Sequence, residues 1–284
     1  MGGIILASLI ATMLMGVPVL AATGSLTISG STAVYPLAID LTNAYNAQHS
    51  EKLSSHIGQV GSDIAIQDVA TGIVDIANSS RNLNQAEVAY GLVTTVIARD
   101  AIAIVVNLAN PVQNLTSQQV ADIFNGTITN WSQVGGNDAP INVNSYTAAD
   151  DTLDYFNEHF FGSSGKIVAS ANQWDSNIRL RQEVAADPNA IGFLSMAYLD
   201  NSLKAPNLDG QVVSLSAVRS GQYSAVRNFN MVTKDQPTGL TKTFIDWVLS
   251  PSGQDIVVQA YLPPIPCQSI IVQSHQGHTS SAPK

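Results

Sequence analysis

Residues 124 to 136 read Phe-Asn-Gly-Thr-Ile-Thr-Asn-Trp-Ser-Gln-Val-Gly-Gly and form the longest distinctive segment of this chain. Two shorter segments, Gly30-Ser31-Thr32 and Gly61-Ser62-Asp63, place small hydroxyl residues directly before stretches with helical spacing. The free N–H groups at the start of a helix, together with nearby hydroxyl groups, can bind an anion. The two short segments therefore predict a cradle for an anionic ligand.

Apolar residues follow strand-like and helix-like spacing in turn along the chain. The run Ala-Ile-Ala-Ile-Val-Val at 101–106 is typical of a strand that is buried on both faces. Further strands are expected over 26–28, 57–60, 74–77, 141–144, 190–193 and 229–232, and helices over 36–48, 63–70, 117–124, 152–161, 178–186 and 242–249. This alternation indicates an α/β fold with a largely parallel sheet.

The composition narrows the classes of function. The chain has 284 residues, of which 45% are hydrophobic and 12% charged, so it can form two domains with buried cores. The net charge is −9 and no Lys/Arg cluster occurs, which argues against a nucleic-acid partner. Cys267 is the single cysteine and the histidines are scattered, so neither an intramolecular disulfide nor a metal site is expected, and no cofactor is implied.

The two ends of the chain differ from its centre. Residues 1–24 include a long apolar stretch with a small-residue pattern near Ala21, which indicates a signal peptide. The alternative is a retained N-terminal anchor, because about 19 apolar residues can just span a bilayer. Either interpretation predicts an extracytoplasmic protein, secreted or held at the cell surface, that meets a membrane only through an uncleaved N-terminus. Residues 268–284 are expected to form a polar tail.

The short segments and the run at 124–136 belong to an ordered series of motifs. It continues with Asp75-Ile-Ala-Asn-Ser-Ser-Arg81, Ala190-Ile-Gly-Phe193 and Phe244-Ile-Asp-Trp-Val-Leu-Ser-Pro-Ser-Gly-Gln254. The series resembles the phosphate-type solute-binding proteins of ABC importers. The resemblance implies a type II periplasmic-binding-protein fold, in which two lobes, each a mostly parallel sheet flanked by helices, are joined by two crossing strands. Lobe one would comprise residues 25–102 with 223–267, and lobe two residues 103–222.

The same resemblance implies a ligand site between the lobes. Its expected residues are Ser31, Thr32, Ala33, Ser62 and Ser80 from lobe one, and Asp150, Asp151 and Thr152 from lobe two. Several of these residues also have a simpler interpretation, because Ser, Thr and Asp are favoured as helix N-caps. Ser31, Thr32, Ser62 and at least one of Asp150 and Asp151 could be such caps, and Ser80 could be a turn residue.

Lobe two departs from the family pattern of an Arg followed by Gly-Ser-Gly-Thr-Arg. Tyr146 stands at the first Arg, Leu153 at the last, and Asp150 and Asp151 replace Ser and Gly. At about 5 Å and an effective dielectric near 20, each carboxylate would repel an anion by roughly 3 kcal/mol. Arg81 and Arg179 are the candidates for a compensating positive charge.

Three functions are compatible with these patterns. The first is capture of phosphate or a related oxyanion for delivery to an ABC permease. The second is the same fold with a neutral or cationic solute, and the third is a ligand-free surface or self-assembling protein. An enzyme is not expected, because no nucleophile-elbow pattern occurs and the adjacent Asp150 and Asp151 cannot face each other across a substrate.

Restoring the family pattern should strengthen phosphate binding. The variant carries Asp150→Ser, Asp151→Gly, Tyr146→Arg and Leu153→Arg. We expect at least a tenfold gain in phosphate affinity, about 1.4 kcal/mol, because repulsion is removed and a bidentate Arg is added. Phosphate titrations of the two proteins side by side measure the gain, and micromolar or tighter binding by the unmodified chain without added metal would contradict the reasoning.

Overall fold

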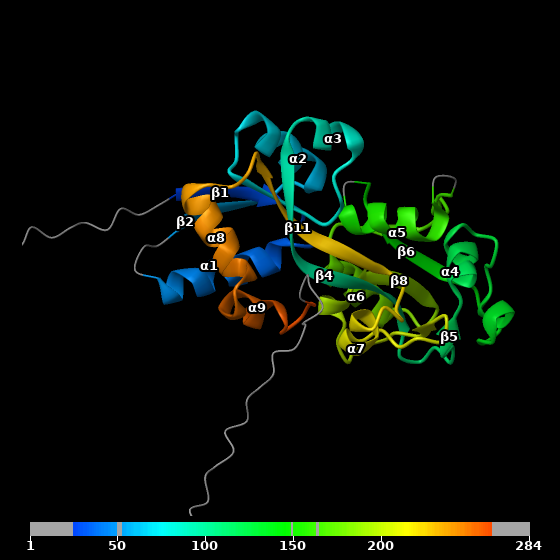
Figure 1. Ribbon diagram of the computed structural model, residues 1–284. Coiled ribbons are helices and arrows are strands. Elements are labelled where there is room, and N and C mark those ends of the chain that lie inside the picture. The colour runs from blue at the N-terminus through cyan, green and yellow to red at the C-terminus, as the bar shows by residue number, and fades with distance from the viewer. Residues whose placement is uncertain (1–24, 50–52, 149, 163–164, 263–284) are drawn as a thin grey trace, which may run out of the picture.

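The structure, a computed structural model, describes residues 25–49, 53–148, 150–162 and 165–262 (Figure 1). The predicted signal or anchor segment (1–24) and polar tail (268–284) lie outside these residues. Within the described ranges, no helix combines the length and the apolar character needed to cross a bilayer.

The strands are β1 (Ser25–Gly30), β2 (Ser54–Gln59), β3 (Ile76–Ser79), β4 (Leu92–Asn107), β5 (Asn114–Leu115), β6 (Asn142–Tyr146), β7 (Asn172–Trp174), β8 (Ala190–Ser195), β9 (Leu203–Lys204), β10 (Asn207–Leu208) and β11 (Val226–Lys234). The helices are α1 (Tyr35–Gln48), α2 (Ser62–Thr71), α3 (Gln85–Ala89), α4 (Ser117–Phe124), α5 (Asp151–Phe161), α6 (Asn177–Ala186), α7 (Leu215–Arg219), α8 (Gly239–Leu249) and α9 (Pro251–Val257). Two 3-10 turns, η1 (Trp131–Val134) and η2 (Met196–Tyr198), complete the set for the described residues.

One sheet runs through both lobes in the strand order β2-β1-β3-β11-β4-β8-β6-β7, with β9 beside β4. The long strand β4 connects them, because Leu92–Ala101 pairs antiparallel with β11 whereas Ile102–Val106 pairs antiparallel with β8. The outer strands are parallel in each lobe. The α/β fold class is therefore confirmed, with the correction that the crossing strands make the sheet mixed (Figure 1).

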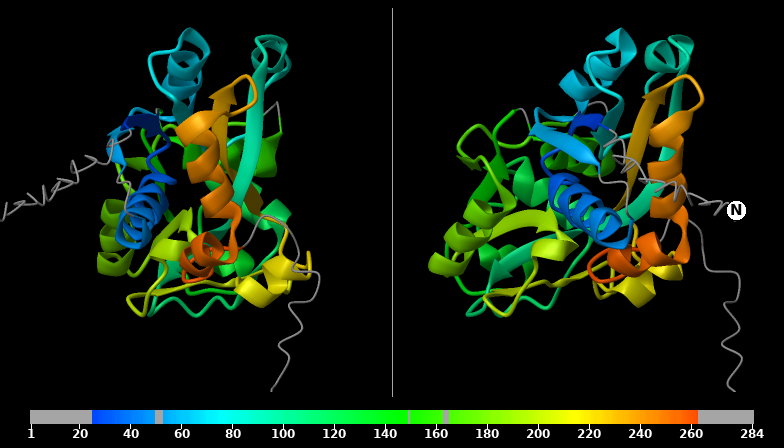
Figure 2. Two further views of the ribbon diagram at one scale, coloured as in Figure 1. Left: turned by 60° about the vertical axis from the view of Figure 1, so that its left-hand side comes forward. Right: turned by 90° about the vertical axis from the view of Figure 1, so that its left-hand side faces the viewer.

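Lobe one has helices on both faces of its sheet. Buried residues of α1, α8 and α9 pack against β1 and β11 in one cluster, which includes Tyr45, Phe244 and Trp247. A second cluster packs α2 against β3 and β11. Figure 2 shows α2 well away from α9 in both views. Segments from both ends of the chain, 26–98 and 229–261, thus share one core, although the exact lobe boundaries stay predictions.

Lobe two has its own core between α4 and α5 on one face and α6 on the other. Aromatic rings fill the first interface, where Phe156 stacks on Phe193 at 4.0 Å between centroids and Phe124 lies 4.6 Å from Phe156. On the other face, Leu180 and Val184 of α6 approach Gly192 so closely that a Cβ there would meet both side chains. This packing fixes α5, whose first residue lies at the lobe interface.

The distinctive segment at 124–136 stabilises lobe two. The Asn130 side chain caps the turn η1 by accepting a hydrogen bond from Ser132 N. In turn, Asn130 N donates to the side-chain oxygen of Gln133. The turn buries Trp131, which is 1% exposed and donates from Nε1 to Asn189 O at 2.9 Å. Trp131 is therefore a packing residue of lobe two.

Close backbone approach makes Gly30 essential at the end of β1. A Cβ at Gly30 would collide with the carbonyl oxygen of Asn78 on the neighbouring strand β3. We expect Gly30→Ala to lower the free energy of unfolding by about 1–3 kcal/mol, because overpacked backbone cannot easily move. Gly58→Ala on β2 is the control, since its nearest neighbour would lie at an ordinary 3.6 Å. Urea unfolding of both variants checks this, and equal losses would contradict it.

Candidate functional site

Three loops of lobe one form the predicted cradle where β1, β2 and β3 end. These strands are parallel, so their carboxyl ends lie at one edge of the sheet. Ser31 Oγ donates to Ser80 Oγ at 2.9 Å, and Ser80 N donates to Ser62 Oγ at 3.1 Å. All three serines are at most 1% exposed. The structure thus brings Ser31, Ser62 and Ser80 into one network, which we call the serine cradle.

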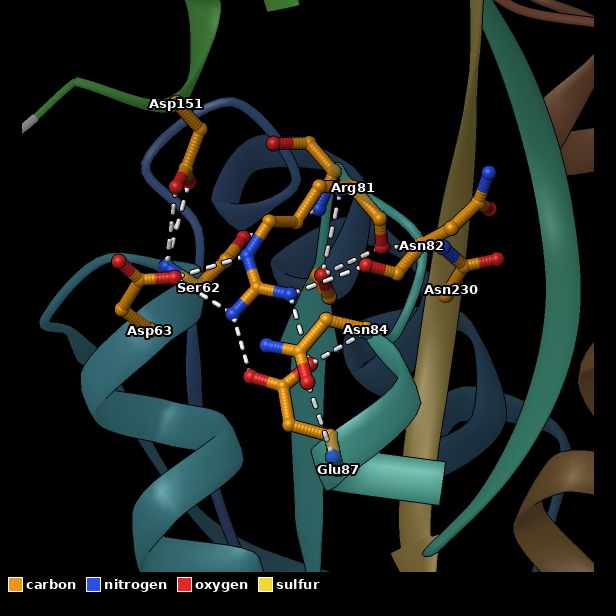
Figure 3. Close-up of polar contacts among 10 residues, drawn as sticks. Ser62, Asp63, Arg81, Asn82, Asn84, Glu87, Asp151 and Asn230 are labelled. Carbon is orange, nitrogen blue, oxygen red and sulfur yellow. Dashed lines mark hydrogen bonds and ion pairs between the residues drawn. The ribbon is translucent and has the colours of Figure 1, made fainter. Parts of the chain in front are cut away.

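Helix α2 begins at the serine cradle without a cap from its own lobe. Gly61, at the N-cap position, has φ of 83° and no side chain. Ser62 N instead donates to the carboxylate of Asp151, at 3.1 Å to Oδ1 and 3.3 Å to Oδ2 (Figure 3). Asp151 is only 6% exposed. A carboxylate of lobe two therefore occupies the anion-binding end of a lobe-one helix.

Asp150 lies beside this contact and has the predicted role of a helix cap, while its role as a ligand-binding residue stays a prediction. Its Oδ1 accepts from Thr152 N at 2.8 Å and caps α5, while its Oδ2 accepts from Thr32 Oγ1 of lobe one at 3.5 Å. Burial raises the pKa of Asp150 above its usual range. Asp150 is thus a helix cap that also contacts the opposite lobe.

Arg81 is held on the lobe-one side of the site by two acids of its own lobe. Its Nε donates to Asp63 Oδ1 at 2.7 Å, and its Nη1 and Nη2 donate to the two carboxylate oxygens of Glu87 at 2.9 and 2.8 Å (Figure 3). This pairing lowers the pKa of Glu87. Arg179 pairs with Glu183 at 2.8 Å along α6 and lies over Trp174. Their roles as charge partners of a ligand stay predictions.

Arg227 is the buried cation next to the two aspartates, and sequence reasoning missed it. It lies on β11, is 3% exposed and pairs with the fully buried Asp100 of β4 at 3.0 Å. Its Nη1 donates to Asp151 O and its Nη2 to Thr152 Oγ1, both at 3.4 Å. The sequence did contain a signal for this pair. Asp100 and Arg227 carry opposite charges, and each lies next to an apolar run of a strand that crosses between the lobes.

Other predicted positions take structural roles. Ala33 is buried, and its N–H donates to Ser31 Oγ at 3.2 Å within the loop. Tyr146, at the family's first Arg position, points into the lobe-two core, where its hydroxyl donates to Asn177 Oδ1 at 2.9 Å. Arg at 146 would lose this packing, so Asp150 and Asp151 are the informative substitutions in the four-residue variant.

Two cavities adjoin the contact between the lobes. One, of about 390 Å³, is lined by Ser80, by α5 residues including Asp154 and His159, and by Arg227. The other, of about 310 Å³, is lined by Thr32 and by residues at the start of α6. Burial raises the pKa of Asp154, and nearby carboxylates add to the effect. Among the described residues no cluster of three His, Cys, Asp or Glu side chains could hold a metal ion.

The arrangement of two lobes joined by crossing strands is similar to that of known solute-binding proteins. A family model described as a PBP superfamily domain matches residues 18–252. The phosphate-binding protein PstS of Borreliella burgdorferi is 31% identical over 81% of this chain and 86% of its own length. The chain belongs to the PstS family of substrate-binding proteins.

Solved structures agree with this membership of the PstS family. A Clostridium perfringens protein with bound phosphate is 35% identical, with a TM-score of 0.79 over 84% of this chain and 99% of that chain. An ABC-type phosphate transport receptor of Vibrio cholerae is 34% identical, with a TM-score of 0.76 over 84% of this chain and 100% of that chain. These likenesses confirm both the family resemblance and the type II fold.

Removing the cation at the crossing strands should destabilise the whole chain. We expect Arg227→Met to cost about 3–5 kcal/mol in unfolding free energy, because Asp100 would stay buried without its partner. Adding Asp100→Asn should recover much of the loss, and urea unfolding measures both. No recovery in the double variant would contradict the assignment.

The loss of unfolding free energy in Arg227→Met should also depend on pH. Burial raises the pKa of Asp100, and losing Arg227 would raise it further. The folded variant then binds a proton more tightly than the unfolded chain, so its stability falls as pH rises between the two pKa values. The deficit relative to the unmodified protein should be smaller at about pH 5 than at about pH 8.

Proposed function

We propose that this protein is the extracytoplasmic solute-binding subunit of an ABC importer and captures phosphate or a related oxyanion between its lobes. One observation carries the proposal: the N–H of Ser62, in the serine cradle at the start of α2, already donates to an oxyanion group, the carboxylate of Asp151. A backbone N–H that binds a carboxylate can bind a phosphate oxygen in the same way, and the cradle hydroxyl groups lie next to it.

Family membership supports the same ligand class. The relatives named phosphate-binding protein PstS cover most of this chain, and the C. perfringens structure contains phosphate. Delivery to a permease follows from this class of receptor, since such proteins release their solute to a membrane partner. The apolar N-terminal sequence supports an extracytoplasmic location.

A second candidate is a neutral or cationic solute. It is favoured by the acids that face the space between the lobes, since Asp150 and Asp151 lie at the contact and Asp154 and Glu158 line the larger cavity. A ligand with an amine or several hydroxyl groups could donate to these carboxylates.

Isothermal titration calorimetry of the mature protein distinguishes these candidates. We expect heat of binding with phosphate and weaker or no heat with sulfate, sugars and amino acids. The affinity should fall at least tenfold in Ser31→Ala combined with Ser80→Ala, because both hydroxyl groups belong to the serine cradle. Ser220→Ala, at an exposed position in lobe two, is the control. Binding of an amino acid or sugar but not phosphate would favour the second candidate.

A further inference from the structure

The contact between Ser62 and Asp151 joins the two lobes directly, from the start of one helix to the start of another. Ser62 is the first residue of α2 in lobe one, and Asp151 is the first residue of α5 in lobe two. The bond from Ser62 N reaches both carboxylate oxygens, as it would reach two oxygens of a bound anion. Both residues are buried, so the contact is shielded from water.

Each partner depends on the other lobe for this interaction. Gly61 cannot cap α2, and Asp63 in the first turn of α2 is engaged with Arg81. The free N–H at the start of α2 therefore has the Asp151 carboxylate as its acceptor. Asp151 in turn is not needed to cap α5, because Asp150 accepts from Thr152 N.

The backbone around Asp151 is held in place by residues of the crossing strands β4 and β11. Arg227 donates to Asp151 O and to Thr152 Oγ1, and it is itself paired with Asp100 on the other crossing strand. The start of α5 is thus fixed relative to both crossing strands. The Asp151 side chain is presented to Ser62 as a positioned group rather than as a freely moving surface acid.

The geometry points to Asp151 as a built-in anion that holds the lobes closed without solute and that an incoming oxyanion must displace. The carboxylate and the solute compete for the same N–H donor, so the carboxylate sets both the resting shape and the affinity. The two interlobe cavities support this arrangement, because one is lined by Ser80 of the serine cradle and the other by Thr32, which donates to Asp150. The competition rests on the proposed function, whereas the closed resting shape does not.

Small-angle scattering of the solute-free mature protein tests the resting shape. The unmodified protein should scatter as the closed form, with the same radius of gyration with and without phosphate. Asp151→Gly and Asp151→Asn should have a larger radius that phosphate reduces. Asp255→Asn is the control: it removes one negative charge at an exposed position of α9 and should remain closed.

A pair of substitutions on the other lobe tests the same bond from the donor side. Ser62→Pro removes the N–H at a helix position that accepts proline, and it should open the solute-free protein. Ser62→Ala retains the N–H and should remain closed. An open solute-free unmodified protein, or an equally closed Asp151→Gly and Ser62→Pro, would overturn the proposal.

Phosphate titration tests the competition. Asp151→Gly should bind phosphate at least tenfold more tightly than the unmodified protein, about 1.4 kcal/mol. Asp255→Asn should change the affinity by less than about threefold, below 0.7 kcal/mol. Ser62→Pro should lose phosphate binding because the donor is shared. Unchanged affinity in Asp151→Gly overturns the competition, whereas no phosphate binding by any variant overturns the proposed function and leaves the scattering result to decide the closed shape.

Discussion

The buried pair of Arg227 and Asp100 is the interaction on which the rest of this structure depends. The two residues lie on the two strands that cross between the lobes, and Ser195 of lobe two adds a bond to Asp100 at 2.7 Å. A buried ion pair stabilises a fold only when its remaining donors and acceptors are satisfied. Arg227 meets this condition by contacting the start of α5. The crossing strands β4 and β11 and the helix α5 therefore form one polar network.

That network explains how two acids can lie where an anion is expected. The guanidinium of Arg227 offsets part of the negative charge of Asp150 and Asp151, and the start of α2 supplies N–H groups and a partial positive charge. The acids are therefore accommodated as ligands of the opposite lobe. At the predicted anion site, lobe one presents donors, while lobe two presents acceptors where the family pattern has donors.

Local sequence patterns were sufficient for most elements. The expected helices at 117–124 and 178–186 match α4 and α6 closely, because their apolar spacing reflects packing on one face. The expected strand at 101–106 was too short, since β4 begins at Leu92, where polar Thr94 and Thr95 interrupt the apolar run. Helices α3, α7 and α9 were missed because one or two turns carry too little periodicity to recognise.

The sequence by itself indicated the fold, the loops that carry the serine cradle and the loss of the family's arginines, because each of these can be recognised in short motifs along the chain. Only the tertiary structure decided which partners the arginines Arg81 and Arg227 contact. Arg81 lies near the site but is held by Asp63 and Glu87, whereas Arg227 comes from a distant strand to the start of α5. Likewise, only folding brings Asp151 to Ser62, 89 residues apart, because a helix start binds whichever acceptor the other lobe presents.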